Sequence, residues 1–211
     1  MRKKLIILFF FISFIGFSQT NLVPYSHDYE FAEGLFLTIN QLKNNSPIPK
    51  SSIISKIPKS DIDFLKQEIQ QKNIVYRDTS NYEHTIETSD IWGYCQNRTI
   101  YINYNNEFNR VNVIGTLFQF TALVKTTVNV MNPMYSNYGL NTTVEELRQF
   151  VLDTQTNKIY SFDVNDMSIL LKNDPELYNQ FMALSNRKKS DSQFIYLRKY
   201  NEKHPLLVVR Y

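Results

Sequence analysis

Cysteine and glycine are both scarce in this chain of 211 residues, and each shortage excludes a class of protein. The single cysteine, Cys95, has no partner for an internal disulfide, so packing alone has to stabilise the fold. The five glycines stand far apart, whereas phosphate-binding loops and nucleophile elbows need glycines a few residues from one another. The sequence therefore disfavours P-loop proteins, dinucleotide-binding folds and G-x-S-x-G hydrolases.

Histidine is also rare, with only His27, His84 and His204 in the chain. There is no H-x-x-x-H pair and no C-x-x-C pair, so we expect no metal site and no cofactor. Cys95 lies in the apolar and aromatic stretch 91–95, which favours a buried core thiol. The alternative is a nucleophilic pair of Cys95 with His84 or His27, because such pairs meet in space rather than in sequence.

What the chain does have is an N-terminal segment typical of a secretory signal peptide. Basic residues at positions 2–4 precede an apolar run over residues 5–17, and Gly16 and Ser18 have the spacing that signal peptidase reads. The run is shorter than the roughly 20 residues of a membrane-spanning helix, so we expect cleavage after Ser18 rather than an anchor. We therefore expect an exported protein, periplasmic rather than extracellular, that is not integral to the membrane after cleavage.

The charge balance follows from the same segment. The bases at positions 2–4 account for the whole formal net charge of +3, because residues 1–18 contain no acid. The rest of the chain is neutral and gives no support for a nucleic-acid or anionic-membrane partner. We expect instead that the partner is an envelope protein or a small ligand.

Apolar periodicity and capping residues predict helices near both ends of the chain. The expected N-caps are Thr38, Ser60, Asn165, Asp174 and Ser190. Asp174 is followed by Pro175, which suits the first position of a helix because its missing N–H would be unpaired there anyway. Ser190 is expected to follow a loop over residues 188–190 and to open the last helix.

The middle of the chain has strand composition. The expected strands are residues 74–77, 91–96, 99–104, 111–124 as one or two strands, 145–152 and 158–164, with a tail strand at 206–209. Asn97 and Arg98 form a candidate two-residue turn, and Asn105 begins the next. We predict an α+β fold: a predominantly antiparallel sheet of about five to seven strands with packed N- and C-terminal helices. Residues 19–32 form an arm, and residues 33–211 form one domain.

Tyrosine is abundant, with fourteen residues. A tyrosine ring combines rigid apolar area with a polar tip, so it suits a binding surface. We predict ligand binding by Tyr101 on a strand and by Tyr135 and Tyr138 in the loop 132–143. The alternative is that these rings belong to an ordinary core and sheet surface.

Several segments spread over about residues 33–206 carry a resemblance to a family: GLFLT and KNNSP at 34–47, IWGY at 91–94, IYIN at 100–103, NDPELY at 173–178 and RKYNEKHPL at 198–206. Together they resemble an uncharacterised family of exported Bacteroidota proteins, a domain of unknown function. The resemblance implies an envelope or secreted location and brings no activity, cofactor or catalytic residue.

Three hypotheses for the function follow from these observations. The first is a non-enzymatic binding or interaction module that uses an aromatic sheet face or the loop 132–143. The alternative is an extracytoplasmic enzyme that uses Cys95 with a histidine, and a structural accessory role is the third hypothesis. A Cys95 buried away from histidine would argue against the enzyme, and a sheet without an aromatic-lined groove would argue against binding.

Overall fold

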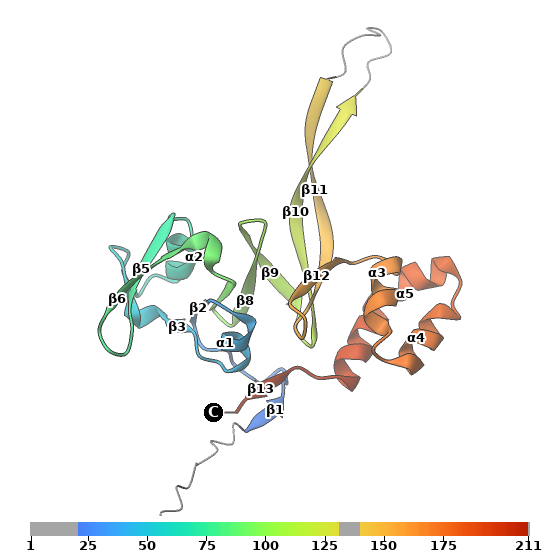
Figure 1. Ribbon diagram of the computed structural model, residues 1–211, viewed down its shortest axis with the longest axis horizontal. Helices are drawn as coiled ribbons and strands as arrows, with labels where there is room; N and C mark the ends of the chain where they lie inside the picture. Colours follow the sequence, from blue (N-terminus) through green and yellow to red (C-terminus); the bar gives the residue numbers. More distant parts are fainter. Residues whose placement is uncertain (1–20, 131–139, 211) are drawn as a thin grey trace, which may run out of the picture.

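The computed structural model describes residues 21–130 and 140–210, which form a mixed α/β fold with antiparallel strand pairs (Figure 1). The strands are β1 (Leu22–Pro24), β2 (Gly34–Phe36), β3 (Ile48–Pro49), β4 (Ile53–Ile54), β5 (Asn73–Arg77), β6 (Glu83–Glu87), β7 (Gly93–Gln96), β8 (Thr99–Tyr104), β9 (Glu107–Val113), β10 (Leu117–Val130), β11 (Leu140–Asp153), β12 (Lys158–Ser161) and β13 (Leu207–Val209). The α-helices are α1 (Ile39–Lys43), α2 (Phe64–Glu68), α3 (Val164–Leu171), α4 (Pro175–Met182) and α5 (Asn186–Lys203).

The main sheet of the described chain has eight strands in the order β12-β11-β10-β9-β8-β7-β2-β3. This corrects the expected five to seven strands, although the antiparallel arrangement and the α+β class are confirmed. The extra strand is easily missed because β3 is a two-residue strand within a proline-rich segment, too short to show alternation. A three-stranded sheet, β4-β5-β6, and the pair β1-β13 complete the strand set.

Two tight turns set the register of the central strands. Asn97 and Arg98 both have positive φ, 51° and 61°, and join β7 to β8; Asn105 and Asn106, at 55° and 62°, join β8 to β9. Both are two-residue connections with the left-handed backbone that matches the twist of a hairpin. The predicted turns are therefore confirmed, and they align Tyr94 with Tyr101 across the first hairpin.

Three apolar clusters cover the faces of the main sheet. On one face, Phe36, Cys95 and Phe120 pack with the N-terminal arm, α1 and β13. On the opposite face, Leu35 and Tyr94 pack against α2 and β4-β5-β6. The third cluster joins β10 and β11 to the helices α3, α4 and α5. Because alternate residues of a strand point to opposite faces, adjacent residues such as Tyr94 and Cys95 belong to different clusters.

The first residues of the helices in the structure test the five predicted N-caps. Thr38 accepts a hydrogen bond from the Gln41 amide, and Asp174 accepts one from the Leu177 amide, so both predicted caps are confirmed. The other three were wrong. The caps of α2, α3 and α5 are Asp63, Asp163 and Ser185 instead of Ser60, Asn165 and Ser190.

The prediction of a loop at residues 188–190 was also wrong, because α5 continues through these residues without a break. Lys188, Lys189 and Ser190 are compatible with a helix interior, and buried Lys189 is held within it. A polar cluster in the sequence was therefore a poor sign of a helix boundary.

β10 and β11 extend together well beyond the rest of the sheet as a two-stranded ribbon (Figure 1). β9 pairs with β10 only at Gln119 and Phe120, and β12 pairs with β11 from Phe150 onward. Beyond these positions the two strands are paired to each other alone among the described strands. The ribbon, from here on, means residues 121–130 and 140–149.

Candidate functional site

A hollow of about 840 Å³ opens between the three-stranded sheet and the main sheet. Its walls come from α2, from the segment joining β6 to β7, and from the β8-β9 hairpin. Its floor is aromatic and its rim is polar. We call this feature the aromatic hollow; its lining residues are Lys66, Ile69, Gln70, Gln71, Lys72, Glu87, Thr88, Ser89, Tyr94, Tyr101, Asn106, Glu107 and Phe108.

Three rings form the floor of the aromatic hollow. Tyr94 and Tyr101 are direct cross-strand neighbours, and their rings stack with centroids 4.6 Å apart and planes 7° apart. Phe108 of β9 meets Tyr94 edge-on at 5.4 Å. Tyr94 is buried, whereas Tyr101 and Phe108 are half-buried. The inner ring therefore supports the outer two, which present their remaining surface to the hollow.

Burial keeps the phenol of Tyr94 neutral. Desolvation is the main cause that raises its pKa far above the usual value, and the neighbouring Tyr101 and Asp63 raise it further. A neutral hydroxyl donates and accepts hydrogen bonds but supplies no charge. Tyr94 is thus a supporting and polar group of the floor rather than a base.

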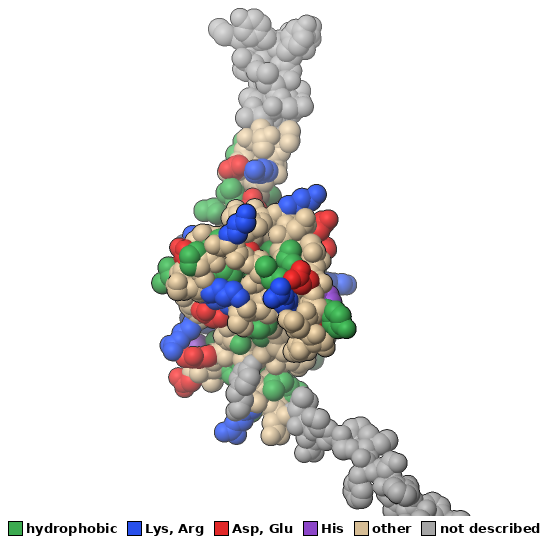
Figure 2. Space-filling view, turned by 90° about the vertical axis from the view of Figure 1, so that its left-hand side faces the viewer, with side chains coloured by type: hydrophobic (Ala, Val, Ile, Leu, Met, Phe, Trp, Pro, Cys, Tyr) green, Lys and Arg blue, Asp and Glu red, His purple; other side chains and the backbone are tan. Residues whose placement is uncertain are grey.

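The rim combines opposite charges with amides. Lys66 and Lys72 are balanced by Glu87 and Glu107, so the formal charges of the lining cancel. Figure 2 looks onto the side of the molecule where β5 and β6 lie, and basic and acidic side chains are interspersed over it. The rim therefore offers donors and acceptors without the single-signed field that a strongly charged ligand requires.

Part of the rim is fixed by its own hydrogen bonds. The Gln71 amide donates to buried Glu68 at 3.1 Å, and the Thr88 hydroxyl donates to the Gln71 carbonyl at 2.5 Å. The first bond orders the end of α2, and the second, with a bond from the Thr88 amide to the Lys72 carbonyl at 3.0 Å, holds that end against the segment after β6. The wall of the hollow is consequently built from two segments about twenty residues apart in the chain.

The predicted residue Tyr101 lies in this hollow, but the sequence reasoning missed Tyr94 and Phe108 as its neighbours. The signal was present, because the turn at Asn97 and Arg98 places Tyr94 opposite Tyr101 by counting outward from the turn. The other predicted ligand-binding residues, Tyr135 and Tyr138, lie outside the described residues.

The thiol of Cys95 is in the core. Its side chain has no exposed surface, and its Sγ lies 3.6 Å from the Phe31 carbonyl oxygen, to which it donates. Burial, with a smaller effect from Glu33, raises the pKa of the Cys95 thiol to about 12. A thiolate is the reactive form of cysteine, so this environment makes Cys95 inert at neutral pH.

The structure does not bring the candidate histidine to Cys95. His84 lies on β6 in the other sheet, where its Nε2 bonds Asp78 at 2.8 Å and its ring stacks on Tyr76. His27 lines a second hollow of about 870 Å³ between the N-terminal arm and α5, together with Tyr25 and Arg198.

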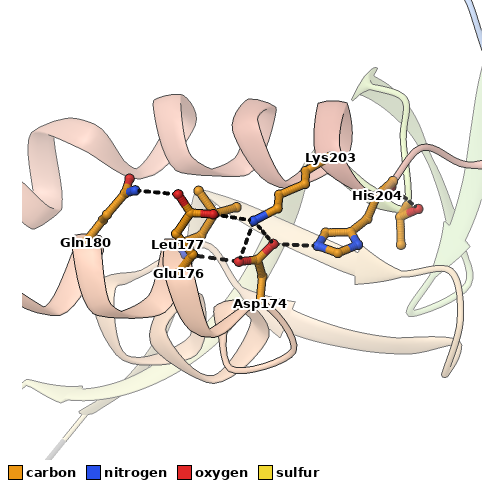
Figure 3. Close-up of polar contacts among 7 residues, drawn as sticks. Asp174, Glu176, Leu177, Gln180, Lys203 and His204 are labelled. Carbon is orange, nitrogen blue, oxygen red and sulfur yellow. Dashed lines mark hydrogen bonds and ion pairs between the residues drawn. The ribbon is translucent and has the colours of Figure 1, made fainter.

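His204 belongs to a polar cluster that joins α4 to the end of α5 (Figure 3). Its Nε2 donates to Asp174 at 2.7 Å, and Lys203 bonds both Asp174 and Glu176. Asp174 also caps α4, so these contacts have a structural explanation: they stabilise the packing of α4 against α5. Within the described residues, no set of three or more histidine, cysteine, aspartate or glutamate side chains is placed to hold a metal ion.

The comparison with protein families decides where the chain belongs. The model of a family described as "Family of unknown function (DUF6563)" matches residues 34–204. The chain is a member of the DUF6563 family. The resemblance to a domain of unknown function is thereby confirmed, while export and a Bacteroidota origin stay predictions.

Curated proteins and solved structures gave no match to this DUF6563 member. The match begins at β2 and ends at the last residue of the polar cluster, so it includes the whole aromatic hollow. None of the helices in the described ranges has both the length and the apolar character needed to cross a membrane.

Proposed function

We propose that this protein is a non-enzymatic, exported binding module and that the aromatic hollow holds its ligand. The observation that carries the proposal is the stacked pair Tyr94 and Tyr101 at the floor of an 840 Å³ hollow with a polar rim. This size lies within the usual range of small-molecule sites, and a concave apolar floor with a few convergent polar groups is their usual composition.

The ligand class that best fits is a neutral oligosaccharide. A sugar ring presents an apolar C–H face, which packs on the exposed surface of Tyr101 or Phe108. Its hydroxyls match the donors and acceptors of Gln70, Asn106 and Glu107 on the rim. The cancelled charges of the lining argue against a strongly anionic or cationic ligand.

Export is supported by the sequence of residues 1–18, in which a basic start, a short apolar run and small residues follow one another. We propose periplasmic delivery. The N-terminal residue of the protein recovered from cells tests the export step, because an intact Met1 would contradict it, and recovery in the periplasmic rather than the culture-medium fraction tests the compartment. An enzyme built on Cys95 has no geometric support, because the thiol is buried, has a raised pKa and bonds a backbone carbonyl.

The binding proposal is tested by titrating the protein with neutral β-linked glucan, xylan and N-acetylglucosamine oligomers, followed by calorimetry. At least one oligomer is expected to bind the wild type. Tyr101→Ala should then weaken binding about tenfold or more, since it removes both the stacking energy and the apolar area of the ring. Loss of the ring leaves Tyr94 uncovered, so the fold of the variant is checked by circular dichroism.

Tyr82→Ala is the matched control, because Tyr82 is an exposed tyrosine on the turn before β6 and does not line the hollow. Its affinity should equal that of the wild type. Equal weakening by both substitutions would contradict the proposed site. Absence of binding by every oligomer would contradict the proposed ligand class.

A further inference from the structure

The ribbon has two long edges that differ in composition. On β10, residues 121–130 are dominated by threonine and valine and include one charged residue, Lys125. On β11, Glu145, Glu146 and Arg148 place three charges along the opposite edge. Charged side chains protect a strand edge from pairing with another strand. The β10 edge is therefore the less protected of the two.

A two-stranded ribbon is only marginally stable by itself in water. Ten residue pairs of the ribbon, about 34 Å at the usual rise per residue, follow the last residue that β9 pairs. At the base of the ribbon, Ala122 and Val124 still pack on the core of the main sheet. Leu123 and Leu147 are direct cross-strand neighbours, and their side chains are 36% and 71% exposed. Pairing of the β10 edge with a further strand would widen the ribbon and satisfy its outward backbone groups.

The charges of the ribbon are already neutralised within it. Lys125 bonds Glu145 across the strands at 3.3 Å, and Arg148 bonds Glu146 at 2.9 Å. The two pairs lie on opposite faces, because consecutive residues of a strand alternate between faces. Each face therefore has no net charge, and two copies of the ribbon meet without repulsion.

We propose that the β10 edge pairs with the same edge of a second copy, so that two ribbons form one four-stranded antiparallel sheet. A two-fold axis perpendicular to the ribbon keeps equivalent faces on the same side and places one residue opposite itself. An axis at Lys125 would oppose two lysines, which is unfavourable. An axis at Thr126 opposes Lys125 to Thr127 and pairs nine residues, 122–130, with their copies.

Within the described part of β10, the Thr126 register is the longest one that avoids the lysine contact. It uses the strand up to Val130 and stops at Ala122, two residues beyond Phe120, the last residue that β9 pairs. The Ala122 side chain is buried on the core face, so only its backbone is offered to the second copy. Two identical edges are complementary in an antiparallel pair, since each supplies alternating donors and acceptors. The second copy thus fits the edge in composition, charge and length.

Cross-linking through residue 126 tests the register, because Cys95 is buried and leaves the introduced thiol as the reactive one. Residues directly opposite in an antiparallel pair lie about 4.5–5.5 Å apart between Cα atoms, within the range of a disulfide. Thr126→Cys should give a covalent dimer on mild oxidation. Thr143→Cys, an exposed threonine on β11, should remain monomeric because the outer strands lie far apart.

Charge substitutions at the same position test the axis independently of oxidation. Thr126→Lys and Thr126→Glu should each raise the dimer dissociation constant about tenfold or more, as like charges face each other. An equimolar mixture of the two variants should recover the dimer, measured as mass by light scattering after gel filtration. Circular dichroism confirms that each variant is folded.

A wild-type mass of one chain across the accessible concentrations, together with no cross-link at residue 126, overturns the proposal. Equal cross-linking of the Thr126→Cys and Thr143→Cys variants also overturns it, because that result would mean random collision or use of the β11 edge. Neither outcome depends on whether the aromatic hollow binds a ligand.

Discussion

Asp174 is the residue on which three contacts converge. Its carboxylate accepts hydrogen bonds from the Leu177 amide at 3.1 Å, from Lys203 and from His204 (Figure 3). The backbone hydrogen bond from Leu177 is the main cause that holds the pKa of Asp174 well below its usual value, and Lys203 and His204 lower it further. One charged oxygen pair thus fixes the start of α4 to the end of α5.

A carboxyl group whose pKa is lower in the folded state stabilises the fold only while it is ionised. The contribution of Asp174 is therefore fully present above the unfolded-state value of about 3.9 and is lost as the pH falls from there through the folded-state pKa. Asp174→Asn keeps a good N-cap but removes the charge. We expect the variant to be less stable than the wild type at pH 7 and to approach it as the solution is acidified.

Urea unfolding at a series of pH values measures this difference. Asp191→Asn is the control, since Asp191 is an exposed aspartate on α5 outside the cluster. Its unfolding midpoint should follow that of the wild type at every pH. A difference between Asp174→Asn and the wild type that stays constant down to strongly acidic pH would contradict the proposed role of the charge.

At the scale of elements, the β7-β8 hairpin depends on a turn in which Arg98 has φ of 61°. A left-handed backbone is unfavourable for a residue with a Cβ, and asparagine followed by glycine is the preferred pair in this turn. The ion pair of Arg98 with Glu30 is highly exposed on both sides and contributes little. We therefore expect Arg98→Gly to stabilise the protein by about 0.5–1 kcal/mol.

The unfolding midpoint in urea measures this gain. Lys158→Gly, at the start of the short edge strand β12, is the contrasting substitution: Lys158 is the residue that pairs with Asp153, its φ is not left-handed, and glycine there adds only backbone entropy to the unfolded state. A gain with Arg98→Gly and a loss with Lys158→Gly would fit the geometry. Destabilisation by Arg98→Gly would mean that the ion pair outweighs the backbone strain.

Local signals such as tight turns also explain which elements could be predicted from the sequence. β8 was predicted to the residue, since strand composition and two tight turns define it locally. β6 was missed because four of its five residues are exposed and its sequence, EHTIE, lacks an apolar face. The long stretch 111–124 was correctly read as strand, but its partner β11 extends further than predicted because pairing, not composition, sets its end.

The candidate site was only partly predictable for a related reason. Tyr101 could be selected as an aromatic residue on a strand. The hollow itself depends on the placement of α2 and of the segment after β6 beside the β8-β9 hairpin. Those contacts join segments that no turn or periodicity connects. The aromatic floor of the hollow can therefore be predicted from the sequence, but its walls cannot.

At the scale of the whole molecule, the two ends of the described chain are joined. β1 pairs with β13, and Tyr25 and Leu206 continue the ladder with a backbone hydrogen bond of 2.7 Å. Leu206 and Val208 are buried in the same cluster as Phe31 and Phe120. Since the family match covers residues 34–204, both partners of this pair lie outside the matched range. The paired ends nevertheless close one face of the main sheet.

This arrangement predicts that substitutions at adjacent residues of β13 lower the stability by very different amounts. Val208 is fully buried, so Val208→Ala leaves a cavity and should lower the free energy of unfolding by about 2 kcal/mol. Leu207 is 47% exposed, so Leu207→Ala removes more atoms but should cost no more than about 0.5 kcal/mol. Urea unfolding gives both values, and limited proteolysis should show faster cleavage within residues 21–33 for Val208→Ala alone. Equal destabilisation by the two substitutions would mean that β13 does not present Val208 to the core, and the closure of this sheet face by the paired ends would then be wrong.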